Sequence, residues 1–508
     1  MAELSRRHLV VGGLAGAGAS LLPGVVTEAH AATFTRYNLA SVKGQAMLRK
    51  YAQAVKLMMA RPKSDPLSWT FQWYTHAVPT NTTKAAEIAA IFGPSPSPNK
   101  ALAQAMWNTC QGHFAAAGEP YFCPWHRAYV CAFEHIIRQV LNDPKFTLPY
   151  WNYTSAASYA VPKEFRQQND PLWGPLFRPN RNPTSNAGQP IFAAGGSASD
   201  LSAGPAMAET QYLPSGAIQG FNQTLDFGLH GNVHVFTGNG QGMGSVPFAA
   251  NDPIFWMHHC NIDRIWTSWN AAGHANPATA AWLNKTFTFA GPDGKGIKVV
   301  VKDYTNTKKC DYDYDLLIPA PLVASAAPSA ASSVAAAAAP AAPLTVAKSQ
   351  SGPVALGAAP VRVNLQPAVP IPPAAPGAAP AASPLSGRLS DLAGNRRIYL
   401  VISDLKANVA PETLFRVYLD LGDGPPADPV NSNYVGSFNF FAAVPHGDSS
   451  DHDHGDTSRS ISFDVTDIAA NLDANGRLRA EHAVTIVPAK APTADARSVV
   501  GNISFVEQ

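Results

Sequence analysis

The sequence predicts a mainly α-helical domain with long loops, followed by a C-terminal all-β sandwich. Apolar residues recur every three or four positions between Met47 and Met59, which is the period of a buried helix face. After Leu385 the composition changes to short runs rich in valine, isoleucine and phenylalanine, separated by turn residues. An alanine- and proline-rich stretch separates the two parts. The predicted boundaries are 32–318 for the helical domain, 319–384 for the linker and 385–508 for the β domain.

Residues 1–31 are typical of a signal peptide of the twin-arginine (Tat) export pathway. Arg6 and Arg7 precede a mildly apolar run, and Ala29 to Ala31 fit a small-residue cleavage site. A disordered or anchoring N-terminus is the alternative. We expect a soluble protein that is periplasmic or secreted, because no other segment reaches the roughly 20 apolar residues of a membrane span.

Composition excludes some classes of partner. The 37 Lys and Arg residues nearly balance the 35 Asp and Glu residues, so the charge favours neither nucleic acid nor a membrane surface as a partner. The five cysteines are too few for a disulfide framework and contain no C-x-x-C pair. We expect Cys123 and Cys131 to be packing residues. The sequence does not indicate an oligomeric state.

Helical patterns continue along the first part of the chain, at 101–111, 127–141, 230–235 and 255–269. Between the second and the third of these the chain is rich in loop residues from Pro144 onward. Loops of that length are usually functional.

The linker cannot supply a packed face, because residues 319–351 are rich in alanine, proline and serine. A strand is possible near 360–365, before a second proline-rich stretch. The alanine runs could form a helix, but the interspersed prolines argue against it. The strands expected after the linker lie in 396–405, 414–422, 435–444, 460–468, 482–489 and 499–508.

Histidines in apolar surroundings are the strongest functional signal. The run from Asn251 to Trp266 places His258 and His259 one helical turn before Asp263. An imidazole in such surroundings is costly unless it is ligated or hydrogen-bonded. The Asp263 carboxylate could hold the second ring nitrogen, as acids do beside metal ligands.

Two further stretches place histidines on helices. His230 and His234 stand four residues apart and so share one helix face. Taken alone, such a pair is more often a surface or core pair than a metal site. A zinc hydrolase would need a glutamate after the first histidine, and that position is Gly231. Upstream, His126 begins a helix that carries Glu134 two turns later.

The combination of these stretches is specific. DPIFWMHHCNID (252–263) and FCPWHRAYVCAFE (122–134) resemble the two copper-binding signatures of the tyrosinase and polyphenol oxidase family, in the family's order. The resemblance covers roughly residues 35–315, and Tyr312-Asp313-Tyr314 resembles the family's end-of-core motif. It implies a type-3 site with two copper ions, each held by three imidazoles, and O2 as co-substrate. Ligation by imidazoles alone suits copper.

The ligands implied by the resemblance are His230, His234 and His259 for the second copper, and His76, His113 and His126 for the first. His258 is then a neighbour of the site. His135 is an alternative for the first copper, but it lies nine residues into the His126 helix and faces another direction. Cys110 could form a thioether with His113 or remain a buried thiol.

The resemblance implies oxidation of small phenols and catechols to o-quinones. Asp226 stands where the family usually has a glutamate that holds a water, and Gly231 replaces an asparagine. These departures predict stronger diphenolase than monophenolase activity. Val246 matches a position above the second copper, where a small side chain leaves room for bulky phenols. The alternatives are o-aminophenol oxidation at the same site, haemocyanin-like O2 binding, and a structural or copper-storage protein.

The β domain resembles the domain that covers the active site in latent polyphenol oxidases. Cleavage of the linker could remove it. Phe438, Phe440 and Phe441 could plug the pocket or line the core of a sheet. His446, His452 and His454 belong to a polar loop, which we expect to be solvated rather than to bind copper.

Overall fold

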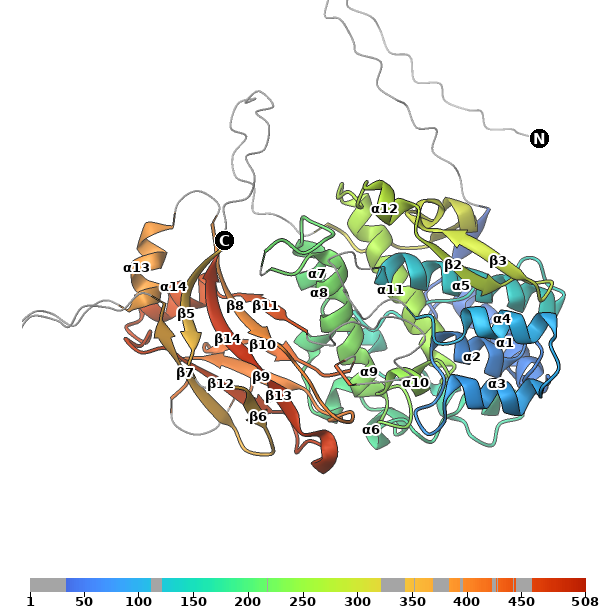
Figure 1. The fold of residues 1–508 in the computed structure, drawn as a ribbon, viewed down its shortest axis with the longest axis horizontal. Coiled ribbons are helices and arrows are strands. Elements are labelled where there is room, and N and C mark those ends of the chain that lie inside the picture. Colours follow the sequence, from blue (N-terminus) through green and yellow to red (C-terminus); the bar gives the residue numbers. More distant parts are fainter. Residues whose placement is uncertain are drawn as a thin grey trace, which may run out of the picture.

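The computed structural model contains a helical domain and a C-terminal β domain that lie side by side (Figure 1). It describes residues 33–110, 121–216, 218–320, 343–350, 352–368, 383–392, 396–422, 426, 428–441, 443–444 and 459–508. The predicted signal peptide and the loop with His446, His452 and His454 lie outside the described residues. None of the described helices is both long and apolar enough to cross a membrane.

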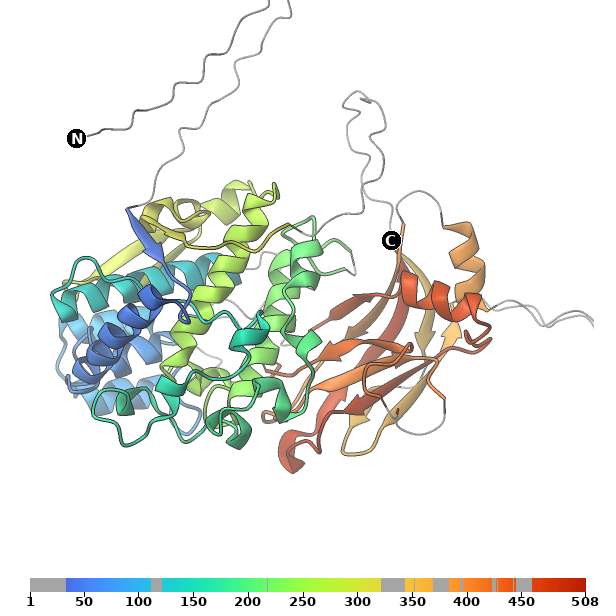
Figure 2. The ribbon, with the colours of Figure 1, turned by 180° about the vertical axis from the view of Figure 1, so that it is seen from behind.

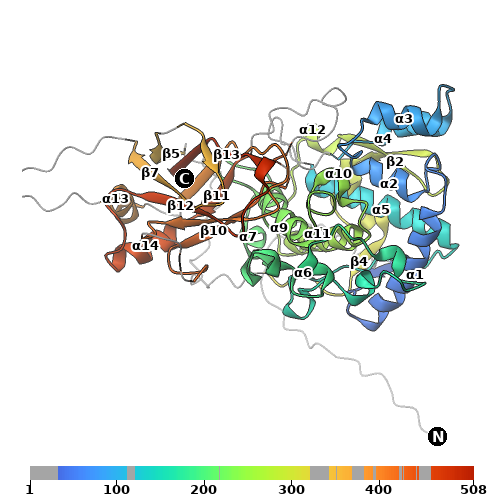
Figure 3. The same ribbon diagram turned by 90° about the horizontal axis from the view of Figure 1, so that it is seen from below.

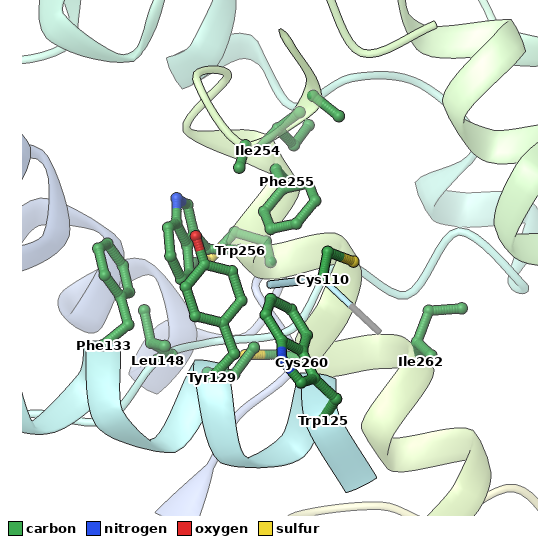
Figure 4. Packing of buried hydrophobic residues seen from close by; sticks show 14 of the residues in the cluster. Cys110, Trp125, Tyr129, Phe133, Leu148, Ile254, Phe255, Trp256, Cys260 and Ile262 are labelled. Atoms are coloured by element: carbon green, nitrogen blue, oxygen red, sulfur yellow. The ribbon is translucent and has the colours of Figure 1, made fainter. Parts of the chain in front are cut away.

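Two long helices form the centre of the helical domain, α5 (Phe122–Leu141) and α11 (Ile254–Ala271). They pack against each other, and most side chains on all sides of both helices are buried, because other elements enclose them. Trp256 of α11 stacks on Phe133 of α5, and its ring centroid lies 4.7 Å from that of Tyr129 (Figure 4). Both helices confirm the sequence prediction.

Shorter helices pack around this pair. α1 (Val42–Met59) and α2 (Trp69–His76) each begin after a serine whose side chain accepts a backbone N–H three residues on, which fixes where the helix starts. α2 ends because Ala77 is extended, and His76 therefore lies in its last turn. The outer helices are α3 (Lys84–Phe92) and α4 (Pro98–Met106).

The chain enters α9 (Gly231–Thr237) through an irregular turn. α8 (Phe221–Thr224) runs into a π-helical turn, η7 (Leu225–His230), in which Gly228 leaves the helical region of φ and ψ. The N–H of Gly231 consequently bonds the carbonyl of Asp226, five residues back, and also that of Gly228. Single π-helical turns are rare in proteins, and those that occur are often found at functional sites.

Two short strands join the beginning of the described domain to its end. β1 (Phe34–Arg36) pairs in parallel with β4 (Tyr312–Tyr314), the Tyr-x-Tyr segment expected at the end of the core. A disulfide between Cys131 of α5 and Cys310, with Cα atoms 6.0 Å apart, fastens the same end. This corrects the expectation that Cys131 is only a packing residue. The two cysteines are 179 residues apart, so their spacing gave no sign of the pairing.

A buried carboxylate connects these elements. Asp263 of α11 accepts hydrogen bonds from Arg127 of α5, from the hydroxyl groups of Tyr312 and Tyr314, and from Arg36 of β1. All five side chains are buried. The expectation that Asp263 holds a histidine ring is therefore wrong, because its hydrogen bonds point away from the histidines and toward the arginines and tyrosines.

The β domain contains one eight-stranded antiparallel sheet rather than the two sheets of a sandwich. Its strand order is β10 (Tyr434–Phe438), β9 (Phe415–Leu419), β12 (Ala483–Pro488), β7 (Val361–Pro367), β5 (Leu344–Ser349), β14 (Asn502–Glu507), β8 (Ile398–Ser403) and β11 (Ile461–Asp464). The sheet curls until its edges meet: a Cβ at Gly436 of β10 would lie 2.6 Å from the ring of Phe463 of β11. Because the sheet nearly closes on itself, both edge strands are protected from pairing with strands of other chains.

The predicted linker is too long. β5, β7 and the short β6 (Val354–Leu356) all lie within 319–384, where only a strand near 360–365 was expected. β5 and β7 are central strands of the sheet, and β6 pairs with β13 (Ser498–Val500). Only alternate residues of β7 are buried, so a few apolar side chains are enough to form this strand. The alanine and proline residues around it hide that short apolar pattern in the sequence. Helices α13 (Pro384–Asp391) and α14 (Thr466–Ala474) were not anticipated.

Substituting Asp263→Asn should lower the free energy of unfolding by about 3–5 kcal/mol at neutral pH, because it leaves the buried guanidinium group of Arg127 without its counter-ion, whereas Arg36 keeps Glu134. Burial by itself would raise the pKa of Asp263, but Arg127 and Arg36 lower it below its ordinary value. A lowered pKa stabilises the folded protein above the unfolded pKa of about 3.9, and this contribution is lost as pH falls through the folded pKa.

The stability difference between wild type and Asp263→Asn should therefore be largest above about pH 4 and shrink below it. Denaturant unfolding at several pH values measures this difference. Asp293→Asn, at an exposed position, is the control and should change stability by no more than about 0.5 kcal/mol. A constant difference from pH 2 to pH 7 would contradict the assignment.

Candidate metal centre

Histidines from two neighbouring helical segments converge on one buried point. His230 ends η7, His234 lies on α9, and His258 and His259 lie on α11. Each offers a ring nitrogen, and these atoms all lie within 4.8 Å of one another. All four side chains are inaccessible to solvent. We call these residues the four-histidine group.

Hydrogen bonds fix which nitrogen of His230 and His234 faces the centre. Nδ1 of His234 donates to the carbonyl of Met243 at 2.7 Å, and Nδ1 of His230 lies 3.1 Å from the carbonyl of Asp226. Each ring therefore carries its proton on Nδ1 and an electron pair on Nε2. The two Nε2 atoms face each other at 3.0 Å. Two electron pairs at this distance repel, so the arrangement fits a cation held by both.

His258 and His259 complete the group with neutral rings. Neither nitrogen of either ring has a hydrogen-bond partner among the described residues. Burial, and then the neighbouring histidines, lower the pKa of both rings and of His234 well below the ordinary value. Buried imidazoles without partners are costly, and coordination to a metal ion would compensate them.

A second group lies beside the first and contains His76, Cys110 and His126, with ligand atoms within 4.8 Å of one another. Nδ1 of His76 lies 3.0 Å from the carbonyl of Val246, and Nδ1 of His126 lies 2.9 Å from that of Phe122. Both rings thus turn Nε2 toward the interior, as in the first group. The sulfur of Cys110 is 3.7 Å from Nε2 of His126.

The two groups adjoin each other. The rings of His126 and His259 stack with their centroids 4.2 Å apart, so donors for two metal ions lie in one buried region. His113, the third ligand expected for the first copper, lies outside the described residues, as does its proposed thioether with Cys110. His135 is only partly buried and belongs to neither group.

His258 is placed more centrally than the sequence predicts. The sequence analysis leaves it as a neighbour of the ligands, whereas its ring nitrogens lie within the four-histidine group and its ring stacks on His230 at 5.2 Å. Adjacent helix residues point about 100° apart, so the pairing of His258 with His259 did not show that both rings turn inward. Only the packing of α11 beside α9 brings them together.

Two of the three expected catalytic positions adjoin His230 of the four-histidine group, and the third adjoins His76 of the second group. The Asp226 carboxylate is buried and lies 3.0 Å from Nδ1 of His230, on the side of the ring opposite Nε2. Val246 begins α10 (Val246–Ala249), is buried, and holds His76 through its carbonyl. Gly231 directly follows His230 and faces the β domain, where Asn439 covers it.

The β domain contributes side chains to this region. It rests on the face of the helical domain that contains α7 (Gly204–Ala208) and α9, as seen from behind and from below (Figures 2 and 3). Arg459 places its guanidinium 4.6 Å from the ring centroid of Phe227. Burial lowers the pKa of Arg459 to about 10, against the opposing effect of the Asp226 carboxylate.

Phe441 of the β domain covers the four-histidine group. Its ring stacks on His234 with centroids 4.0 Å apart and lies edge-on to His230 at 5.6 Å. Phe441 packs in the core of the helical domain, whereas Phe438 and Phe440 pack in the core of the β domain. Of the two alternatives predicted for these phenylalanines, Phe441 therefore follows the first and covers the site, and Phe438 and Phe440 follow the second and line the core of the sheet.

A cavity of about 360 Å³ opens on the outer side of Phe441. Val246 and Pro247 of the helical domain line one wall, and Ala410 and Glu412 of the β domain line the other. The Glu412 carboxylate accepts the backbone N–H of Gly240 at 2.6 Å and so joins the two walls. The cavity lies at the boundary between the domains, next to the aromatic ring that covers the histidines.

Comparison with known proteins agrees with this geometry. A family model that describes the common central domain of tyrosinase matches residues 66–272. Over these residues the helical domain is similar to the central domain of tyrosinases. Tyrosinase domains are dicopper domains, and the two adjoining histidine groups fit copper. Residues 342–508 match a second model, described only as a domain of unknown function (DUF7868).

Similar proteins are tyrosinases and polyphenol oxidases. The chain is 33% identical over 313 residues to tyrosinase HcTyr1 of Hahella, covering 56% of this chain and 64% of that protein. It is 27% identical over 317 residues to a chloroplastic polyphenol oxidase of Malus domestica, covering 54% of this chain and 47% of that protein. The chain thus spans about half to two thirds of the length of these relatives.

Solved structures share the fold of both domains. The structure of latent apple tyrosinase superposes with a TM-score of 0.57 at 21% identity, covering 93% of this chain and 96% of that chain. A structure of recombinant latent aurone synthase gives a TM-score of 0.60 at 20% identity, covering 93% of this chain and 89% of that chain. The fold of the helical domain and that of the curled sheet therefore occur together in other proteins.

Replacing a histidine of either group should remove copper from the helical domain. Wild type should bind two copper ions per chain, and His126→Ala or His259→Ala should each lose about one, because each substitution removes a buried donor. His135→Ala is the matched control, since it lies on the same helix as His126 and should keep both ions. Metal analysis of the purified, folded proteins checks this. Copper loss in His135→Ala with full loading of His126→Ala would reverse the assignment.

Proposed function

We propose that this protein is a type-3 copper oxidoreductase that oxidises catechols, and phenols more slowly, to o-quinones with O2. The pair of adjoining histidine groups, with Nε2 atoms facing one buried region, carries the proposal. In the balanced reactions, two catechols and one O2 give two o-quinones and two waters, and one phenol and one O2 give one o-quinone and one water. Copper bound there supplies the electron transfer between phenol and O2.

Backbone carbonyls prepare the histidines for this role. Met243, Val246 and Phe122 each accept a ring N–H, so the rings are oriented before a metal ion binds. Aromatic side chains then exclude water, because Phe122 packs 4.7 Å from His126 and Phe255 packs 4.2 Å from His259. A dry, preorganised site favours electron transfer to O2 over side reactions.

The surroundings favour catechols over monophenols. Hydroxylation of a monophenol requires loss of a proton with a pKa of about 10 in solution, and so needs a base beside the substrate. Asp226 lies behind the ring of His230, and Gly231 offers no side chain to position a water. We therefore assign Asp226 the role of orienting His230. Val246 leaves the cavity beside Phe441 wide enough for bulky phenols.

We further propose that the β domain keeps the enzyme latent. Phe441 occupies the space above His234 that an aromatic substrate would need. The similar apple tyrosinase and aurone synthase structures are of latent forms. Substrate access then requires Phe441 to move, either by local opening or by removal of the β domain.

Cutting the chain between Ile318 and Pro343 should raise its activity, because all strands of the sheet then stay in one fragment, whereas a cut between β7 and α13 would leave β5 and β7 on the helical domain. Activity on a large phenol should rise more than activity on catechol, because a small catechol can pass a partly open cover. Quinone formation from catechol and from a monophenol, measured before and after limited proteolysis, tests both the cover and the reaction. Oxygen binding without turnover would indicate a carrier. A clean two-fragment digest with unchanged rates would show that the β domain is not a cover.

Phe441→Ala should reproduce part of this activation in the uncut chain. Removing the ring opens the space above His234 without detaching the β domain. The rate on a large phenol should rise severalfold and the rate on catechol less. Phe92→Ala, on the outer helix α3 of the helical domain, is the control and should leave both rates unchanged. Equal rates in wild type and Phe441→Ala would show that the ring does not limit access.

A further inference from the structure

Asn439 of the β domain enters the helical domain beside the metal centre. Its side-chain N–H groups donate to the carbonyl of Phe227 at 2.8 Å and to Oδ1 of Asn232 at 2.9 Å. Its Oδ1 accepts the backbone N–H of Phe441 at 3.0 Å. Asn439 is buried, and every polar atom of its side chain is used. One amide thus joins two helical segments to the residue that covers the histidines.

The π-helical turn makes one of these contacts possible. In a regular α-helix the N–H of Gly231 would bond the carbonyl of Phe227. In this turn it bonds the carbonyl of Asp226 instead, and the carbonyl of Phe227 accepts the N–H of Asn439. The irregular backbone before His230 therefore carries a binding site for the β domain.

Asn439 fits only because residue 231 is glycine. A Cβ at Gly231 would lie 2.5 Å from Oδ1, 2.7 Å from Nδ2 and 2.9 Å from Cγ of Asn439. The whole amide faces the bare Cα of Gly231, so rotation of the amide cannot relieve the overlap. Any other residue at 231 must displace Asn439.

We propose that Asn439 is the positioning residue that holds Phe441 on His234, and that Gly231 is the residue that admits it. We call this contact the amide latch. Its effect on substrates rests on the proposed function, whereas the contact itself does not. Opening the amide latch removes the hydrogen bond that orients the backbone of Phe441, and the aromatic cover leaves the four-histidine group.

The latch controls a local movement rather than the attachment of the whole domain. Other contacts join the domains further from the histidines: Arg416 donates to the carbonyl of Gly195 at 3.1 Å, and Gln508 donates to that of Ser215 at 2.7 Å. These contacts persist when Asn439 is lost. Only the segment that contains Phe441 is then released, as a local opening of a docked domain.

Hydrogen–deuterium exchange of the copper-free full-length chain tests the latch without using activity. In Asn439→Ala and in Gly231→Ala, the peptide that contains Phe441 should exchange about tenfold faster than in wild type, because a buried amide has lost its partners. Peptides from β12 and β14 should be unchanged. Asn433→Ala is the matched control, since the side chain of this buried asparagine bonds Leu419, Asp420 and Arg477, which all belong to the β domain. It should leave the Phe441 peptide unchanged.

The double variant that combines Asn439→Ala with Gly231→Ala tests whether the two residues act on the same contact. With Asn439→Ala present, Gly231→Ala has nothing to displace and should add no further exchange, because the two changes act on one contact. Alanine also stabilises a helix relative to glycine, so any remaining effect on α9 should be slower exchange. If Gly231→Ala accelerates exchange equally in both backgrounds, or if neither single variant changes the Phe441 peptide, the latch is overturned. If Asn439→Ala does not fold, Gly231→Ala alone decides the question.

Quinone formation separates the latch from the proposed function. If both the latch and the proposed function are correct, Asn439→Ala and Gly231→Ala should also oxidise a large phenol severalfold faster than wild type in the uncut chain. Faster exchange in proteins that never form quinone would retain the latch and reject the oxidase. Normal quinone formation that responds to Phe441→Ala, with no exchange response to Asn439→Ala or Gly231→Ala, would retain the oxidase and reject the latch.

Discussion

The buried carboxylate of Asp263 is the constraint on which the helical domain depends. Removing a charge from water costs several kcal/mol, and here two arginines and two tyrosine hydroxyl groups compensate it. These partners come from α5, β1 and β4, so the carboxylate is satisfied only when all three elements are in place. α5 and α11 also carry His126 and His259, whose rings stack at 4.2 Å. The structural ion cluster and the metal centre are thus two regions of one helix pair.

Backbone carbonyls play the corresponding part for the histidines. Imidazoles that were free to rotate would gain little from burial, whereas a ring that donates Nδ1–H to a fixed carbonyl must present Nε2 inward. Met243, Val246 and Phe122 supply these carbonyls from loops and helix ends. Each of these residues contributes through its main chain, so its side chain gives no sign of the role. The geometry of the centre is therefore set by the course of the backbone as well as by the ligands.

The boundary between the domains shows how one residue can serve two purposes. Gly231 leaves the position after His230 without a side chain, and this absence admits Asn439 of the β domain. In the function that we propose, the same absence weakens the positioning of a base water. A side chain at 231 and the seating of Phe441 on His234 exclude each other sterically. The chemistry available at the histidines and their cover by the β domain are consequently linked through a single Cα atom.

The sequence by itself determined the helical domain, the β composition of the C-terminal part and His76, His126, His230, His234 and His259, because helical spacing and local motifs record short-range geometry. Tertiary structure decided what depends on contacts distant in the chain. It places the His258 ring among the other histidines, and it pairs Asp263 with two arginines. It also brings Cys131 and Cys310 together in a disulfide and includes β5 and β7, predicted as part of the linker, in the sheet. It also divided three nearby phenylalanines between two cores. Residue spacing cannot encode such pairings, since they arise only when separate elements pack against each other.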